Sequence, residues 1–188
     1  EDPIRSEIFS ASRLEAHAES LAKAQTVTQD PRYGQRLAPR IHQNRKVLEK
    51  AYLSILQTVR DQKAITPAAE WLIDNFHVIR AQLQDIRANF PLSYYRGLPK
   101  LASGPLEGYP RIYGVAWAFV AHTDSRFDPE LLKRFLIAYQ RVQPLTIGEL
   151  WALPIILRAV LLENLRRLAA RIVGSQMARN EADLIVDE

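Results

Sequence analysis

The chain has 188 residues, with 25 basic and 21 acidic side chains and a formal net charge of +4 at pH 7. It contains no cysteine, which excludes disulfide bonds, thiolate metal sites and thiol nucleophiles. This length favours one domain with a sizeable hydrophobic core, and because the charges are scattered we expect no nucleic-acid partner.

Apolar residues recur at helical spacing through most of the chain, which predicts an all-α fold, a helical bundle of about six helices. Ser12 and Glu15 have the spacing of a capping box, which predicts a first helix over about 12–25. After a break, apolar residues three and four apart predict a second, long helix from about 38 to 62. We expect residues 1–188 to form a single helical domain.

A third helix is predicted to begin after Thr66, because a threonine N-cap followed by Pro67 suits the first turn of a helix. Its apolar stripe continues to Ile86. The following segment, Asn89–Pro110, is rich in proline, glycine and tyrosine, which rules out a long regular element. We expect an ordered loop or short helical turns that pack on the body of the domain.

The last third of the chain contains three more predicted helices. Residues 111–122 are mostly apolar and predict a buried helix, and Asp128 followed by Pro129 predicts the start of the next. A second capping box, Thr146 to Glu149, predicts the start of a long C-terminal helix.

The C-terminal helix changes in character along its length. Residues 150–165 are apolar, and residues 166–183 are mixed and charged. This change predicts a first half in the core, a kink near Pro154 and a second half that forms an exposed arm. The apolar run is too short and too interrupted for a membrane span, which needs about 18 residues or more.

The stretch His-Thr-Asp-Ser-Arg at 122–126 contains residue types used in catalysis, but it lies between two predicted helices. Such side chains satisfy the unpaired N–H and carbonyl groups at helix ends, and Arg126 is available to pair with Asp124 or with a neighbouring helix. A Ser-His-Asp triad is disfavoured because one turn cannot easily hold the nucleophile, the base and the orienting carboxylate apart. We therefore predict a structural link and no catalytic residue here.

A metal site is the next alternative. Glu70, Asp74 and His77 have helical spacing that places them on one face, and His17 or His42 is available to complete a ligand set. A solvated or arginine-paired face explains the same pattern more simply. We predict no metal and no cofactor in this segment.

The tyrosine-rich tract also contains basic residues, a mixture that suits stacking on sugars or bases and contact with phosphate. The competing interpretation is a packed loop whose tyrosines bury their rings. If the tract binds a ligand, the predicted binding residues are Tyr94, Tyr95, Arg96, Lys100, Arg111 and Tyr113.

Residues 158–172 form a basic, amphipathic part of the C-terminal helix, which is one pattern of a helix lying on an anionic membrane surface. Its basic residues are Arg158, Arg166, Arg167 and Arg171, and its apolar side contains Leu161, Leu165, Leu168 and Ile172. A helix packed on its neighbours, or on the rest of a longer protein, has the same pattern. Both interpretations stay open from the sequence.

Three long stretches, in order, resemble the N-terminal region of the bacterial cyclic β-1,2-glucan synthases. They are "EIFSASRLEAHAESLAKAQ" (7–25), "ITPAAEWLIDNFHVIRAQLQDIR" (65–87) and residues 94–169, which begin "YYRGLPKLASGPLEGYPRIYG". Residues 26–64 and the tail after 170 are less diagnostic.

The resemblance implies a fragment of a very large inner-membrane protein that builds a cyclic β-1,2-glucan from UDP-glucose. In that family a glycosyltransferase region makes the glucan, a cyclising activity closes it, and a region like the glycoside phosphorylases controls its length. The matched segment is expected on the cytoplasmic side, with the other domains of the synthase as partners and glucan or UDP-glucose as candidate ligands. The glycosyltransferase aspartate pair and Gln-x-x-Arg-Trp element of the family are absent from this sequence. The resemblance therefore implies a non-catalytic helical domain that acts in docking, assembly or regulation.

Overall fold

The structure, a computed structural model, describes residues 1–30, 34, 37–89 and 92–186. Within this part of the chain lie eight helices and one two-stranded ribbon, which confirms the all-α prediction. The elements are α1 (Ala11–Ala24), β1 (Val27–Thr28), α2 (Leu37–Arg60), α3 (Pro67–Asp74), α4 (Phe76–Ala88), α5 (Leu92–Arg96), β2 (Lys100–Leu101), α6 (Arg111–His122), α7 (Pro129–Val142) and α8 (Ile147–Val186).

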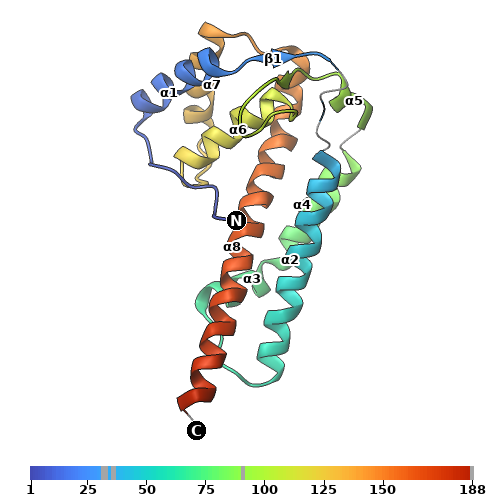
Figure 1. The fold of residues 1–188 in the computed structure, drawn as a ribbon, viewed down its shortest axis with the longest axis vertical. Coiled ribbons are helices and arrows are strands. Elements are labelled where there is room, and N and C mark those ends of the chain that lie inside the picture. The colour runs from blue at the N-terminus through green and yellow to red at the C-terminus, as the bar shows by residue number, and fades with distance from the viewer. Residues whose placement is uncertain (31–33, 35–36, 90–91, 187–188) are drawn as a thin grey trace.

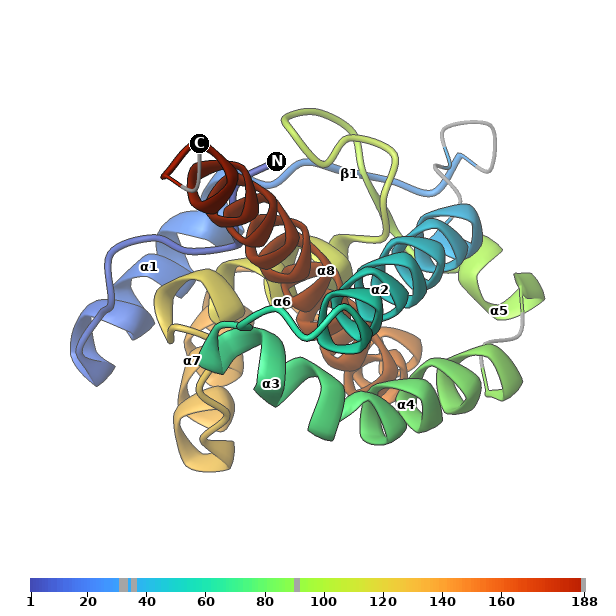
Figure 2. The same cartoon turned by 90° about the horizontal axis from the view of Figure 1, so that it is seen from below.

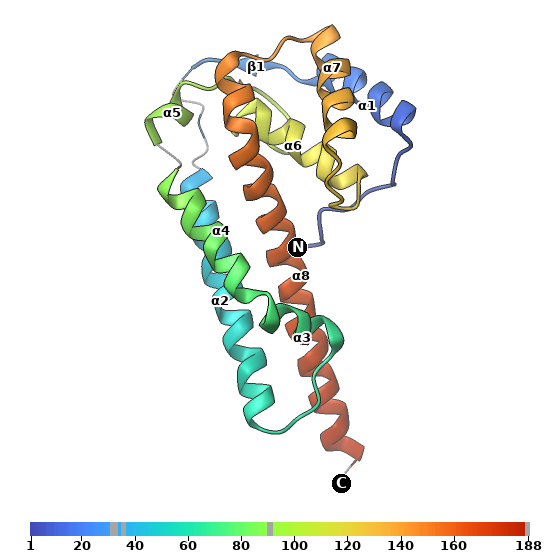
Figure 3. The same ribbon diagram turned by 180° about the vertical axis from the view of Figure 1, so that it is seen from behind.

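Helix α8 runs the length of the molecule and joins two regions (Figure 1). In the upper region, α1 packs on α7, and α6 packs on the first half of α8. In the lower region, α2 lies along the second half of α8, and α3 and α4 complete the layer (Figures 2 and 3). One hydrophobic core runs through both regions, with Phe119, Phe135 and Tyr139 in the upper one and Leu48, Ile55 and Leu72 in the lower one.

The first helix begins slightly earlier than predicted. Its N-cap is Ser10, whose side-chain oxygen accepts the Arg13 backbone N–H at 3.4 Å. The predicted cap, Ser12, lies inside the helix, and Glu15 forms an ion pair with Arg134 at 2.5 Å instead of closing a capping box. Ser10 and Ser12 have equivalent side chains, so either can cap the helix. The predicted cap at Ser12 depended on Glu15, and that glutamate binds Arg134 instead.

The predicted third helix is two helices. Thr66 caps the first as expected, since its hydroxyl accepts the Ala69 N–H at 3.2 Å. The break lies at Asn75, whose backbone N–H and side-chain amide both donate to the Trp71 carbonyl, at 3.0 and 2.9 Å. Asparagine competes for backbone groups in this way, so α3 ends and α4 begins in a new direction.

The segment from Asn89 to Pro110 contains one short helix, α5, as the sequence predicted, and Phe90 and Pro91 lie outside the described residues. It also contains β2, which pairs antiparallel with β1 through Val27 opposite Leu101 and Thr28 opposite Lys100. The ribbon was not predicted, because two-residue strands are too short to show an alternating pattern.

Both later helix starts follow the sequence. The Asp128 carboxylate accepts the N–H groups of Glu130 and Leu131 at 3.0 and 3.1 Å. In the Thr146 capping box, the Thr146 hydroxyl accepts the Glu149 N–H at 3.2 Å and the Glu149 carboxylate accepts the Thr146 N–H at 2.8 Å.

The second half of α8 is not a free arm, in contrast to the sequence prediction. Ala169 and Gln176 are buried, and the Gln176 side-chain amide donates to the Ala64 carbonyl at 2.8 Å. Arg171 and Arg179 are exposed, while the buried side of this part of the helix packs on α2 and α3. Within the described ranges, no helix has an apolar stretch long enough to cross a bilayer.

Candidate functional site

Four of the six predicted binding residues are buried and support the fold. They are Tyr95, Lys100, Arg111 and Tyr113. Burial raises the pKa of the Tyr95 and Tyr113 hydroxyls. The Lys100 ammonium donates to the Arg96 and Leu98 carbonyls at 3.0 and 3.4 Å. These contacts are those of a packed loop, which is the competing interpretation of the tract.

The other two predicted residues, Tyr94 and Arg96, lie at the surface on α5. The Tyr94 hydroxyl donates to the Gly148 carbonyl at the start of α8. A ligand role for the six residues as a set stays a prediction.

Arg111 forms a buried ion pair with Glu149 that ties the start of α6 to the start of α8. The guanidinium donates to both carboxylate oxygens, at 2.8 and 2.5 Å, and to the Pro144 carbonyl at 3.0 Å. Glu149 is 0% exposed. Burial alone would lower the pKa of Arg111, but hydrogen bonding and charge attraction to Glu149 raise it. The two side chains satisfy each other, so this pair is structural.

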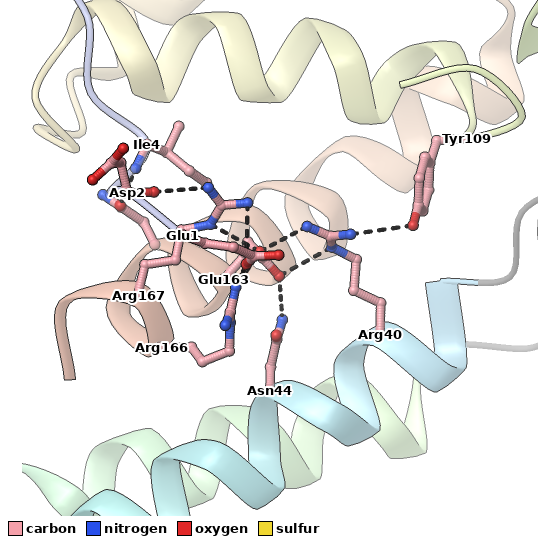
Figure 4. A network of polar contacts seen from close by, with 10 residues as sticks. Glu1, Asp2, Ile4, Arg40, Asn44, Tyr109, Glu163, Arg166 and Arg167 are labelled. Atoms are coloured by element: carbon pink, nitrogen blue, oxygen red, sulfur yellow. Dashed lines mark hydrogen bonds and ion pairs between the residues drawn. The ribbon is translucent and has the colours of Figure 1, made fainter. Parts of the chain in front are cut away.

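Glu163, on α8, is the centre of a second ion-pair network (Figure 4). Its carboxylate accepts two hydrogen bonds from Arg40 at 3.1 and 2.8 Å, one from Arg166 at 3.0 Å and one from Arg167 at 3.0 Å. The Asn44 amide donates a further bond at 2.8 Å. Burial of Glu163, 1% exposed, would raise its pKa, but these hydrogen bonds prevail and hold the pKa at about 2.

Glu163 was not predicted from the sequence, although its position carries a signal. It is the one acidic residue after Glu149 in the apolar stretch 150–165. A buried glutamate needs a partner, so an acid in a core-facing run predicts basic side chains nearby. What the sequence does not show is that one of those partners, Arg40, comes from α2.

The network also holds the N-terminal segment against α8. The Arg167 guanidinium donates to the Asp2 carbonyl at 2.7 Å, and the Ile4 N–H donates to the Asn164 side-chain oxygen at 2.6 Å. Arg166 forms an ion pair with Glu1 (Figure 4). Three chain segments therefore meet at this point: the N-terminus, α2 and α8.

A cavity of about 620 Å³ adjoins this network. Its apolar lining includes Leu21, Leu101 and Leu106. Its polar and aromatic lining comprises Gln25, Arg40, Ser103, Tyr109, Trp117 and Arg167. The Arg40 guanidinium donates to the Tyr109 hydroxyl at 3.3 Å, and the Arg167 guanidinium lies over the Trp117 ring, 5.0 Å from its centroid. Tyr109 belongs to the predicted binding tract, but Trp117 and the two arginines come from other parts of the chain.

The stretch 122–126 joins α6 to α7 as predicted and does not form a triad. His122 stacks on Phe9 with ring centroids 4.0 Å apart, and its Nδ1 contacts the Glu7 carbonyl at 2.8 Å. The Ser125 hydroxyl accepts the Asn164 amide at 2.8 Å. Asp124 pairs with Arg5 at 3.1 Å, where the sequence analysis considered Arg126. These contacts hold the N-terminal segment.

The residues of the metal hypothesis, Glu70, Asp74 and His77, lie on either side of the break at Asn75. The Nδ1 of His77 contacts the Asp74 carbonyl at 3.0 Å. In the part of the chain that the structure describes, no group of three or more histidine, aspartate and glutamate side chains is arranged to hold a metal ion.

The basic stretch 158–172 is largely committed to the fold. Arg158 pairs with Asp85 on α4, and Arg166 and Arg167 bind Glu163. On its apolar side, the residues that pack against the core are Leu161, Leu165 and Ile172. Six of the eight side chains proposed to face a membrane therefore have partners within the domain, whereas Leu168 and Arg171 are exposed.

The chain was compared with known proteins. No family model matches it. Over all 188 residues it is 40% identical to the cyclic beta-(1,2)-glucan synthase NdvB of Rhizobium meliloti (strain 1021), and it spans 7% of the length of that relative. The chain is homologous to part of a cyclic β-1,2-glucan synthase. This identity confirms the resemblance predicted from the sequence and extends it through residues 26–64 and the tail after 170.

The buried arginine and glutamate pairs are part of the framework of the fold. The cavity beside Glu163 and the exposed start of α8 are two features that this framework leaves open.

Proposed function

We propose that this chain is a non-catalytic helical segment of a cyclic β-1,2-glucan synthase, on the cytoplasmic side of the bacterial inner membrane, and that it docks on the rest of that protein. The observation that carries this proposal is an exposed apolar surface at the start of α8. Trp151 is 77% exposed and Ile147 is 74% exposed.

These side chains share one face of the helix. Ile147, Leu150, Trp151 and Pro154 are spaced i, i+3, i+4 and i+7, and all four are exposed. We call them the α8 docking face. The opposite side of the same turns is buried in the upper core. Large exposed apolar residues that cluster in this way mark interaction surfaces, and tryptophan is enriched among the residues that dominate binding energy.

The docking face contains no charged side chain, because the only ionisable residue between 147 and 154, Glu149, is buried against Arg111. An uncharged face fits an apolar protein surface better than nucleic acid or an anionic lipid surface. The partner that we propose is an apolar surface on the rest of the synthase polypeptide. This chain spans only 7% of the length of its relative, which leaves a large polypeptide to dock on.

Co-purification of the tagged 188-residue chain with a synthase lacking this segment tests the proposal. We expect wild type to co-purify, and Trp151→Ser to weaken association by at least about tenfold, because exposed tryptophans at interface centres often contribute 2 kcal/mol or more. The matched control is Trp71→Ser on α3, where the tryptophan is 52% exposed but lies away from the docking face. Equal binding by both variants, or no binding by wild type, would refute docking through this face.

A further inference from the structure

We propose that the cavity between α1, α2, α6 and the 102–110 loop binds a neutral glucose oligosaccharide, a short stretch of glucan chain. The assignment of glucose rests on the proposed function, whereas the choice of a neutral sugar rests on the cavity itself.

The size and lining of the cavity suit a small ligand. Its volume of about 620 Å³ lies within the range of about 300–1,000 Å³ that is typical of ligand sites. Most of the lining is apolar, with a few polar groups at defined places, which is the usual composition of such sites.

Two aromatic side chains line the cavity, Tyr109 and Trp117. Both are half-buried, and both are positioned by Tyr113, whose ring lies 5.2 Å from that of Tyr109 and 5.9 Å from that of Trp117. Pyranose rings present C–H groups on their faces, and these pack on aromatic rings while the hydroxyls point outward to polar groups. Fixed aromatic rings beside polar side chains therefore suit a sugar.

The arginines favour a neutral ligand over an anion. Arg40 already donates to both oxygens of Glu163 and to Tyr109, and Arg167 donates to Glu163 and to the Asp2 carbonyl. Arg40 thus already gives to Glu163 the bidentate pairing that a phosphate would require, and Arg167 has donors committed to Glu163 and to Asp2. The other N–H groups of these two guanidinium groups suffice to donate hydrogen bonds to sugar hydroxyls.

Gly114 keeps the floor of the cavity open. A Cβ at this position would lie 2.9 Å from the Gln25 side-chain nitrogen and 2.9 Å from a Leu101 methyl carbon. A larger residue would therefore push the polar Gln25 amide, which is positioned to serve a ligand hydroxyl, out of place.

Isothermal titration of the 188-residue chain with linear β-1,2-linked glucose oligosaccharides tests the proposal, with β-1,4-linked oligosaccharides and UDP-glucose as comparison ligands. We expect the β-1,2 oligosaccharide to bind, and Trp117→Leu to weaken it by about tenfold through loss of the aromatic contact. Trp71→Leu, the same change outside the cavity, should leave affinity unchanged. Circular dichroism of each variant verifies folding.

A second variant guards against a folding defect at Trp117. Ala24 is exposed at the end of α1 and lines the cavity, so Ala24→Phe should obstruct it without touching the core. Ala68→Phe, at an exposed position of α3, is its matched control. Loss of binding in Ala24→Phe alone supports the site.

Three results would overturn the proposal: no saccharide binding, equal weakening by the cavity variants and their controls, or tighter binding of UDP-glucose than of the oligosaccharide. These results can be told apart from a failure of docking by co-purification. Trp117→Leu and Ala24→Phe leave the α8 docking face intact, so both variants should still co-purify with the truncated synthase.

Discussion

The upper region and the junction between the upper and lower regions each bury a glutamate of α8, but the two glutamates have different partners. In the upper region, Glu149 has one arginine, Arg111, and both side chains are almost fully buried. At the junction, where the start of α2 meets the middle of α8, Glu163 has three arginines, and Arg40 is partly exposed beside a cavity.

The Arg111–Glu149 pair is a closed structural contact, whereas the cluster around Glu163 is open to a further partner. Arg111 and Glu149 balance each other, so removing the charge of one partner alone leaves an unpaired buried charge. Among the described residues, the ion pairs of Arg40, Arg166 and Arg167 are with Glu163 and Glu1, so three cations share two carboxylates. Such a cluster keeps some hydrogen-bond donors for a ligand, and it lies where a ligand has room.

The largest effect is expected in the upper region. Glu149→Ala removes the partner of buried Arg111 and the carboxylate of the capping box, and it should lower the free energy of unfolding by about 3–5 kcal/mol. Chemical denaturation measures it. The double variant Glu149→Leu with Arg111→Met should recover much of the loss, because it leaves no buried charge. A loss below about 1 kcal/mol in Glu149→Ala would show that the pair is more hydrated than its burial indicates.

The next effect is the pH dependence of the ion-pair network around Glu163. The pKa of Glu163 is about 2 in the folded protein, below the 4.5 of an ordinary glutamate. The stabilisation is therefore fully present above about pH 4.5 and is lost as the pH falls towards 2. It is on the order of 3 kcal/mol, since each unit of pKa shift corresponds to about 1.4 kcal/mol.

Glu163→Gln is the variant that isolates this effect. At neutral pH it should be less stable than wild type, and the difference should shrink as the pH falls below about 4.5 in parallel unfolding experiments. A difference that stays constant down to acid pH would contradict the ionised state of Glu163.

The smallest effect is at the surface of the upper region. Asp128→Ala removes the N-cap of α7 and should cost about 0.5–2 kcal/mol, measured by thermal unfolding. Glucan synthesis by the synthase should be unaffected under conditions where the variant is folded. Unchanged stability with abolished synthesis would instead point to a chemical role for Asp128.

Local chemistry explains what the sequence predicted correctly. Thr66, Asp128 and the Thr146 capping box act within one turn, so their spacing is sufficient to locate a helix start. The break at Asn75 and the shift of the first cap to Ser10 depend on how side chains choose between nearby partners, which spacing does not determine.

The site was less predictable than the fold, for a physical reason. The tyrosine and arginine tract was identified, but the sequence does not tell which of its rings face the core, and Tyr95 and Tyr113 do. The cavity combines Arg40, Tyr109, Trp117 and Arg167 from four separate parts of the chain. Only tertiary packing brings them together.

The central claim is that this segment assists the synthase by docking and does not catalyse. The most direct measurement is glucan synthesis from UDP-glucose by a synthase lacking the segment, with and without the purified 188-residue chain added back. We predict that synthesis is weak without the chain, is restored by wild type and by Trp71→Ser, and is not restored by Trp151→Ser. Full synthesis by the inserted, stable, truncated enzyme alone would contradict it.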